Sequence, residues 1–254
     1  MFTPQGPTLR ELAVQALSSI EHGYDLLAPK FDHTPFRTPD SILDAVASAL
    51  DPIGPFDHGL DLCCGTGAGM RVLRELCRGS ATGVDISAGM LTVGRERAEA
   101  ARGSSRVSGA PHVSWVRGDA RALPFASAFD LVVSFGAFGH FLPRELPGLF
   151  AQVHSVLRPG GRFAFPIAAP PRPSSPWYWA LLGFDAAMRV RNALWRPSFV
   201  MYYRAFRLDE VRRELTRAGF EVELRDLSEF GSRPDGSPRC RMVVATRGSD
   251  PAPE

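Results

Sequence analysis

The chain has 254 residues, 44% of them hydrophobic and 22% charged, which is typical of a folded globular protein and excludes a disordered, collagen-like or coiled-coil chain. The net charge of +2 is too small to indicate a polyanionic partner, so we expect no binding to nucleic acid. A chain of this length can bury most of its apolar surface without disulfides or a structural metal. We therefore expect one large domain, or one domain with an appendage.

The first fifty residues are predicted to be helical. Apolar residues recur at helical spacing from Leu9 to Leu27, and Thr38-Pro39 is a typical start for a further helix over Ser41–Leu50. We expect residues 1–50 to form an N-terminal helical cap.

From His58 onward, predicted strands and helices alternate. The strands are His58–Cys63, Ala81–Ile86, His112–Arg117, Phe129–Ser134, Arg162–Ile167, Glu221–Asp226 and Arg241–Thr246. The helices are Gly69–Cys77, Ala88–Ala101, Leu146–Leu157 (which Arg158-Pro159-Gly160-Gly161 should end) and Asp209–Ala218. This alternation indicates an α/β fold with a mostly parallel, doubly wound sheet in residues 51–248. An insertion, Pro170–Arg204, and a flexible polar tail, residues 249–254, interrupt the pattern.

The cysteines and the N-terminus carry no sign of a metal site or of export. Cys63, Cys64, Cys77 and Cys240 lack the spacing of zinc ligands, so we expect buried small hydrophobes in a reducing compartment and no metal. The first residues lack the basic and apolar regions of a secretory signal, and no apolar stretch reaches the ~18 residues that a membrane span requires. The sequence predicts a cytoplasmic protein without a stable membrane span, and it does not indicate the oligomeric state.

A glycine-rich loop, Cys64-Gly65-Thr66-Gly67-Ala68-Gly69, follows the first strand and opens a helix. Such a loop lets a ligand approach the backbone beside a helix N-terminus. Two details distinguish it from a dinucleotide-binding loop. Asp61 lies within the strand, where an apolar residue is usual, and the G-x-G-x-x-G spacing is absent.

Carboxylates also lie at the carboxyl ends of the next two strands. Asp85, in Gly83-Val84-Asp85-Ile86-Ser87, lies where it can accept hydrogen bonds from both hydroxyls of a ribose. Asp119, at the end of the third strand, can accept a hydrogen bond from an exocyclic amine. Any one of these acids could merely cap a helix, but three at consecutive strand ends indicate one ligand site.

In these motifs the sequence resembles the class I S-adenosylmethionine-dependent methyltransferases, and it is most similar to the ubiquinone- and sterol-methylating small-molecule type. The similarity covers about residues 58–168, through Asp61–Gly69, Asp85, Gly118-Asp119, Phe129–Ser134 and Leu157–Gly161. It implies a Rossmann-like, seven-stranded sheet with the last strand antiparallel, and S-adenosyl-L-methionine as the cofactor, converted to S-adenosyl-L-homocysteine.

The resemblance also implies roles for individual residues. Carried over by position, Asp61 and the loop frame the methionine moiety, Asp85 binds the ribose and Asp119 binds the adenine. Tyr24 could reach the cofactor from the cap. The expected cofactor-binding residues are Tyr24, Asp61, Cys63, Gly65, Thr66, Gly67, Asp85, Ile86, Met90, Asp119, Ala120, Ser134 and Phe135.

Methyl transfer needs a positioned nucleophile and the exclusion of water, and a general base helps when the acceptor is a hydroxyl or an acidic carbon. His140, which follows the fourth strand, is the candidate base, and a role in the wall of the pocket is an equal alternative. The Asp/Asn-Pro-Pro-aromatic motif of amino-methylating nucleic-acid enzymes is absent from this place, as are acidic metal ligands.

The insertion contains most of the tryptophans and tyrosines of the chain. We expect a helical lid over a hydrophobic or aromatic acceptor, and the alternatives are an interfacial helix for a lipid-like substrate and a helix that only packs. The expected acceptor-binding residues are Phe138, His140, Trp177, Trp179, Trp195, Tyr202 and Tyr203.

The sequence thus predicts a methyltransferase that modifies a hydroxyl or carbon of a small metabolite. Two alternatives remain: a non-methylating protein on the same fold, pericyclase-like or regulatory, and an NAD-dependent oxidoreductase, against which Asp61 argues.

Overall fold

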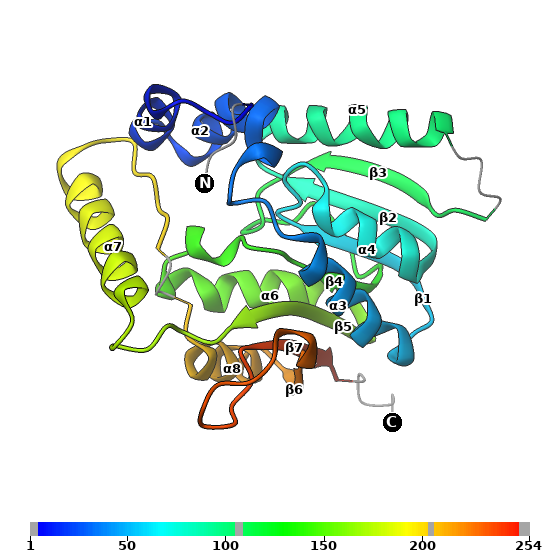
Figure 1. Cartoon of the computed structure of the whole chain (residues 1–254). Coiled ribbons are helices and arrows are strands. Elements are labelled where there is room, and N and C mark those ends of the chain that lie inside the picture. Colours follow the sequence, from blue (N-terminus) through cyan, green and yellow to red (C-terminus); the bar gives the residue numbers. More distant parts are fainter. Residues whose placement is uncertain (1–4, 105–108, 203–205, 249–254) are drawn as a thin grey trace.

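A single twisted sheet organises the protein, seen here in a computed structural model that describes residues 5–104, 109–202 and 206–248 (Figure 1). Its seven strands follow the order β3-β2-β1-β4-β5-β7-β6. The strands are β1 (Phe56–Leu62), β2 (Cys77–Asp85), β3 (His112–Arg117), β4 (Phe129–Val133), β5 (Leu157–Ala168), β6 (Phe220–Asp226) and β7 (Cys240–Arg247). Only β7 runs antiparallel to its neighbours β5 and β6, which confirms the predicted Rossmann-like α/β fold.

Helices cover both faces of the sheet. They are α1 (Leu9–Leu17), α2 (Ile20–Leu27), α3 (Asp40–Leu50), α4 (Ala68–Leu76), α5 (Ala88–Ser104), α6 (Leu146–Val156), α7 (Pro176–Leu194) and α8 (Leu208–Arg217). Helices α3 and α4 bury one apolar stripe with one face of the sheet, and α6 and α8 form a second core with the other face. Strands that are buried on both faces consist of continuous runs of apolar residues, and these runs made the strands predictable from the sequence.

Several boundaries differ from the predicted ones. The first helical stretch is two helices, because Ser18 is extended and the Ser19 hydroxyl accepts from the His22 amide as the cap of α2. β2 begins at Cys77, directly after α4, rather than at Ala81. Arg158-Pro159-Gly160-Gly161 does not separate two elements: these residues lie in the first part of β5, where the pairing with β4 changes register and Gly160 takes φ 76°. A glycine here accommodates a bulge.

Two parts of the chain stand at the edge where the parallel strands end. Helices α1 and α2 lie above this edge, and with the residues that follow them up to residue 39 they are called the cap below; α3 packs on the sheet instead, and α7 stands across from the cap at the left of Figure 1. Only Asp185 and Met188 of α7 are fully buried. This edge is where ligands bind in open α/β sheets, so the cap and α7 are positioned to enclose one. The predicted tail, residues 249–254, lies outside the described residues.

Candidate active site

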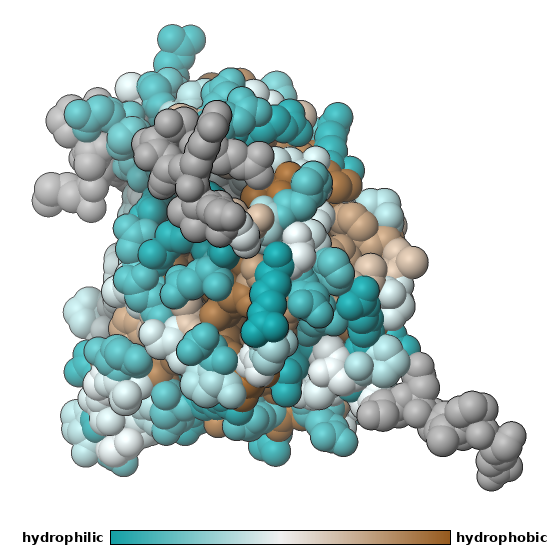
Figure 2. Space-filling model, turned by 90° about the vertical axis from the view of Figure 1, so that its right-hand side faces the viewer, coloured by the Kyte–Doolittle hydropathy of each residue, from teal (hydrophilic) through white to brown (hydrophobic). Residues whose placement is uncertain are grey.

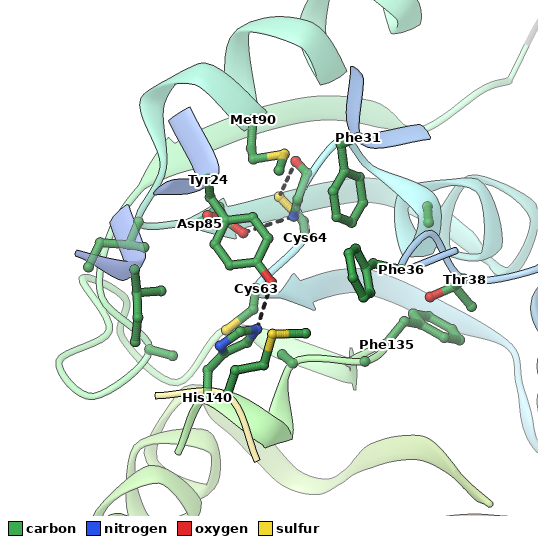
Figure 3. Close-up of a pocket in the computed structure, with 18 of the residues that line it drawn as sticks. Tyr24, Phe31, Phe36, Thr38, Cys63, Cys64, Asp85, Met90, Phe135 and His140 are labelled. Carbon is green, nitrogen blue, oxygen red and sulfur yellow. Dashed lines mark hydrogen bonds between the residues drawn. The ribbon is translucent and has the colours of Figure 1, made fainter. Parts of the chain in front are cut away.

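A cavity of about 800 Å³ opens at the carboxyl ends of the parallel strands, within the range of small-molecule sites. The cap, the glycine-rich loop and α7 all contribute to its wall, as the close-up in Figure 3 shows in part. The predicted residues that line it are Tyr24, Asp61, Cys63, Gly65, Thr66, Asp85, Ile86, Met90, Asp119, Ala120, Phe135, His140 and Trp177.

The loop between β1 and α4 turns sharply, through left-handed backbone at Cys63 (φ 56°) and Gly65 (φ 52°). A non-glycine residue with this φ is uncommon and suggests a functional constraint. Gly69 is needed for a different reason: a Cβ there would lie 2.6 Å from the carboxylate oxygens of Asp61. The loop therefore brings the first amides of α4 directly onto this carboxylate.

Asp61 is buried in the floor of the cavity and is only 1% exposed. Burial, with a smaller contribution from the nearby charge of Asp85, raises the pKa of Asp61 well above its usual range, although the amides of Met70 and Gly69 donate to it. Its Oδ2 atom has no hydrogen-bond partner among the described residues. A buried acceptor without a partner is costly, so this atom is suited to a cationic or donating group of a ligand.

Asp85 joins the end of β2 to the glycine-rich loop. Its Oδ2 accepts from the Gly65 amide at 2.8 Å, and its Oδ1 accepts from the Ser87 amide at 2.9 Å. Burial raises the pKa of Asp85, and these amide donors oppose the shift. Each carboxylate oxygen can accept a second hydrogen bond, so Asp85 can also hold two hydroxyls of a ligand.

Asp119 is paired with Arg121, which the sequence analysis did not single out. The Arg121 Nε atom donates to both carboxylate oxygens of Asp119, at 3.0 and 3.1 Å, and its Nη1 donates to Glu145 at 3.1 Å. Burial acts to raise the pKa of Asp119, but the hydrogen bonds from Arg121 outweigh it, so the pKa is lowered. Asp119 is therefore an ionised acceptor, oriented by Arg121, at the cavity wall.

The cap is fastened over the glycine-rich loop and the start of α5 by carboxylates. Asp25 accepts from the Ser87 hydroxyl at 2.6 Å and from the Gly89 amide at 2.8 Å, so it supplies acceptors to the N-terminus of α5. Asp32 accepts from the Thr66 hydroxyl at 2.7 Å and forms an ion pair with Arg97. Neither carboxylate lies in a recognisable motif, so neither could be found from the sequence alone.

We expect Asp25→Ala to lower the free energy of unfolding by about 1–3 kcal/mol, because two amide or hydroxyl donors at the start of α5 lose a charged acceptor. Thermal denaturation should show a fall of about 2–4 °C for each kcal/mol. Asp44→Ala is the matched control, since Asp44 forms only an exposed ion pair with Arg71 and should cost less than about 1 kcal/mol. Equal losses in the two variants would contradict a fastening role for Asp25.

Tyr24 and His140 meet across the cavity (Figure 3). The Tyr24 hydroxyl lies 2.7 Å from Nε2 of His140, and Nδ1 of His140 lies 2.7 Å from the carbonyl oxygen of Val200. A carbonyl only accepts, so Nδ1 carries the proton; Nε2 of the neutral ring then accepts from Tyr24. Burial lowers the pKa of His140, so the neutral form predominates at pH 7.

Several predicted site residues lie elsewhere. Among the cofactor residues, Gly67 packs against Trp115 rather than the cavity, and the buried Ser134 hydroxyl donates to the Leu62 carbonyl. Among the acceptor residues, Phe138 is buried in the core and stacks on Phe206 at 4.3 Å.

The aromatic residues of the insertion also differ in place. Trp177 lines the cavity, but Trp179 donates to the Pro173 carbonyl and is 61% exposed. Trp195 ends α7 and is exposed, and Tyr202 is buried beneath Arg189 with its hydroxyl accepting from Asn192. The difference between Trp177 and Trp179 follows from helical geometry, because side chains two positions apart on a helix point in different directions. Tyr203 lies outside the described residues.

The comparisons with known proteins agree with this geometry. Residues 60–161 match a family model described as a methyltransferase domain. The chain is 37% identical over 139 residues to a ubiquinone/menaquinone biosynthesis C-methyltransferase of Roseobacter denitrificans, covering 53% of this chain and 52% of that protein. It is 29% identical to a 2-phytyl-1,4-naphthoquinone methyltransferase of Synechococcus elongatus, covering 65% and 69%. Over residues 60–161 the chain is therefore similar to the methyltransferase domain of S-adenosylmethionine-dependent methyltransferases.

Solved structures show the same methyltransferase fold. Magnesium protoporphyrin IX methyltransferase from Synechocystis, determined with bound S-adenosylhomocysteine, aligns with a TM-score of 0.57 at 17% identity and covers 90% of this chain and 98% of its own. A methyltransferase from Methanosarcina mazei aligns with a TM-score of 0.59 at 20% identity, covering 78% and 95%. The chain spans about half the length of the first curated relatives that it matches.

The methyltransferase cavity fits S-adenosylmethionine. Asp61 has an unpartnered buried oxygen that would suit an ammonium group, and Asp85 has acceptor capacity that would suit two ribose hydroxyls. Ile86 and Met90 supply apolar walls beside Asp119, as an adenine ring requires. S-adenosylmethionine has an ammonium group, a ribose and an adenine ring. These parts would lie in turn beside Asp61, Asp85 and Asp119, which stand at the ends of successive strands.

Proposed function

We propose that this protein transfers a methyl group from S-adenosylmethionine to a carbon or hydroxyl of a small, apolar aromatic acceptor of quinol type. One observation carries the proposal: the cavity edge that suits the cofactor continues into a chamber with aromatic and aliphatic walls. A pocket that served only the cofactor would not need this second part.

The chamber explains the proposed acceptor. Residues that the sequence analysis did not select make up much of it, from the cap, from the segment after β4 and from α7: Phe31, Phe36, Phe141, Leu181, Phe184 and Met201. Figure 3 shows Phe31, Phe36 and Phe135 gathered beside the Tyr24–His140 pair. Such walls favour an apolar ring over a charged or strongly hydrated substrate. One relative named above is described as a C-methyltransferase of ubiquinone/menaquinone biosynthesis and the other as a 2-phytyl-1,4-naphthoquinone methyltransferase, which supports this acceptor class here.

When bound, S-adenosylmethionine supplies a methyl group on a positively charged sulfur, which leaves with the electron pair of the broken carbon–sulfur bond. The chain's own residues supply position and proton transfer. Because Nε2 of His140 is the accepting nitrogen, the Tyr24 hydroxyl can pass its proton there while it takes the proton of the acceptor. The cap and α7 exclude water from the reacting groups.

The direct test is turnover of methyl-labelled S-adenosylmethionine with a short-chain, water-soluble hydroquinone. We expect label in the organic product and formation of S-adenosylhomocysteine. Calorimetry on the same preparation should show cofactor binding. Cofactor binding without transfer to hydroquinones, phenols or other aromatic acceptors would contradict the proposal and favour a non-methylating protein on this fold.

Two tryptophans of α7 provide a matched test of the chamber. Trp177 lines the cavity and Trp179 does not, although both are mainly exposed near the start of the same helix. We expect Trp177→Ala to lower kcat/KM for the soluble acceptor at least tenfold, about 1.4 kcal/mol, because part of the acceptor's apolar contact is lost. Trp179→Ala should change it less than threefold, and both should leave the cofactor Kd unchanged. The same loss in both variants would contradict an acceptor contact specific to Trp177.

A further inference from the structure

One side of α7 faces solvent and is apolar throughout. We call this the outer face of α7, formed by residues spaced three or four apart along the helix: Trp179, Leu182, Ala186, Val190 and Leu194. Leu194 is 81% exposed and Val190 is 58% exposed. A surface helix of a soluble protein normally turns charged residues to water, so this face is unusual.

The residues of α7 outside this face, and those that follow the helix up to residue 202, carry few charges, and most of these are positive. Between residues 176 and 202 the only acidic residue is Asp185, which is buried, whereas Arg189, Arg191 and Arg196 are basic. The Arg189 guanidinium lies over the ring of Tyr202, and Arg196 donates to the Ser198 hydroxyl. In the described part of the chain neither Arg189 nor Arg196 forms a salt bridge. An apolar face beside exposed arginines is complementary to an anionic, apolar surface.

Tryptophans flank this face. Trp179 lies near the N-terminal end of the helix and Trp195 at its C-terminal end, and both are exposed. Tryptophan favours the boundary between lipid headgroups and acyl chains, because its ring is apolar and its N–H is polar. The opposite side of the molecule, shown in Figure 2, is hydrophilic over most of its area, with hydrophobic residues in smaller patches. Apolar side chains are therefore not exposed to the same extent on the side of the molecule opposite α7.

The same helix reaches the cavity. Trp177, Leu181 and Phe184 line the chamber, while Val190 and Leu194 face solvent. We propose that the outer face of α7 docks on the surface of an anionic lipid bilayer, so that an apolar acceptor dissolved in the bilayer enters the cavity past α7. The acceptor part rests on the proposed function; the docking itself does not. No helix of the described chain is long and apolar enough to span a membrane, so docking would be peripheral.

Vesicle co-sedimentation of the full chain tests this without turnover. We expect binding to vesicles of phosphatidylcholine with 30% phosphatidylglycerol, chosen as roughly the anionic content that attracts basic segments, and at least tenfold weaker binding to phosphatidylcholine alone. Val190→Glu should weaken binding at least tenfold. Leu26→Glu is the matched control, because Leu26 is 50% exposed on α2 and the charge change is the same. Its binding should stay within twofold.

A second pair of variants tests the charges. Arg196→Gln should weaken binding to the anionic vesicles about fivefold, whereas Arg74→Gln, at an exposed position on α4, should not. Equal binding of Val190→Glu and the parent protein would overturn the proposal. So would a dimer, seen by analytical ultracentrifugation, that Val190→Glu dissociates without any vesicle binding, because the face would then bind a second copy.

The same experiment separates docking from catalysis. Val190→Glu should keep the cofactor Kd and the turnover of the soluble acceptor, and it should lose turnover only with a long-chain hydroquinone held in vesicles. If soluble turnover is absent in the parent protein while vesicle binding is present, the proposed function fails and the docking surface stands. If turnover of the soluble acceptor is present and vesicle binding is absent, the docking surface fails and the proposed function stands.

Discussion

Replacing Asp85 with alanine is expected to weaken S-adenosylmethionine binding about a hundredfold to ten-thousandfold. Asp85 is the acceptor proposed for two ribose hydroxyls, and each charge-assisted hydrogen bond is worth roughly 1.5–3 kcal/mol, with 1.4 kcal/mol per factor of ten. Asp85 also holds the Gly65 amide, so its loss loosens the glycine-rich loop. Isothermal titration calorimetry with S-adenosylmethionine and S-adenosylhomocysteine measures the effect.

Two controls make this result specific. Asp226→Ala removes the same charge from the end of β6, where Asp226 pairs with exposed Arg241, and should leave the cofactor Kd within twofold. Asp85→Asn keeps one acceptor oxygen and should fall between the parent protein and Asp85→Ala. Tighter binding of a nicotinamide dinucleotide than of S-adenosylmethionine would contradict the assignment of the site.

Removing the imidazole of His140 is expected to lower kcat/KM by about a hundredfold or more, the usual contribution of a general base. Tyr24→Phe should lower it at least tenfold, because Nε2 of His140 then loses the hydroxyl 2.7 Å away that we propose to carry the proton. Both variants should bind the cofactor with Kd within about threefold of the parent protein. Steady-state kinetics with the soluble hydroquinone separates kcat from KM, and a purely structural role would change stability without this split.

The pH profile gives an independent signature. Burial lowers the pKa of His140 from its ordinary 6.5, so activity should fall only when the pH drops through this lower pKa, and His140→Gln should lack this acid limb. The unfolded chain binds a proton near pH 6.5 and the folded chain does not, so the free energy of unfolding should also fall as the pH decreases from about 6.5. A profile that is identical in His140→Gln would contradict the role of base.

The fold, and the residues at the sheet edge proposed to bind the cofactor, could be predicted from the sequence because both depend on short local sequence patterns. Buried parallel strands are apolar runs between turn residues, and the first strand carries Asp61 where only a ligand explains an acid. Asp85 is the last residue of β2 and Asp119 comes two residues after β3, so the parallel strands bring both to the same edge of the sheet.

The acceptor side could not be predicted in the same way. Phe36 and Met201 reach the chamber from the cap and from the end of the insertion, and nothing in the sequence separates them from core residues. The aromatic cluster of the insertion suggested one shared role, but helix rotation places Trp177 at the cavity and Trp179 outside it. The hydrogen bond between Asp32 and Thr66 depends on how the cap packs against the sheet. The composition of the chain and the spacing of its motifs do not specify this packing.

The fastening of the cap has a consequence for the order of events in each catalytic cycle. Tyr24 and Phe31 line the cavity, and Asp25 and Asp32 hold the cap that carries them to the start of α5 and the glycine-rich loop. We expect the nucleoside to exchange with these contacts broken and the acceptor to bind after they reform. Binding should then be sequential, with the nucleoside first in and last out, and the slow step should be departure of S-adenosylhomocysteine. The first turnover should appear as a rapid burst of methylated product, followed by a slower steady rate set by opening of the cap.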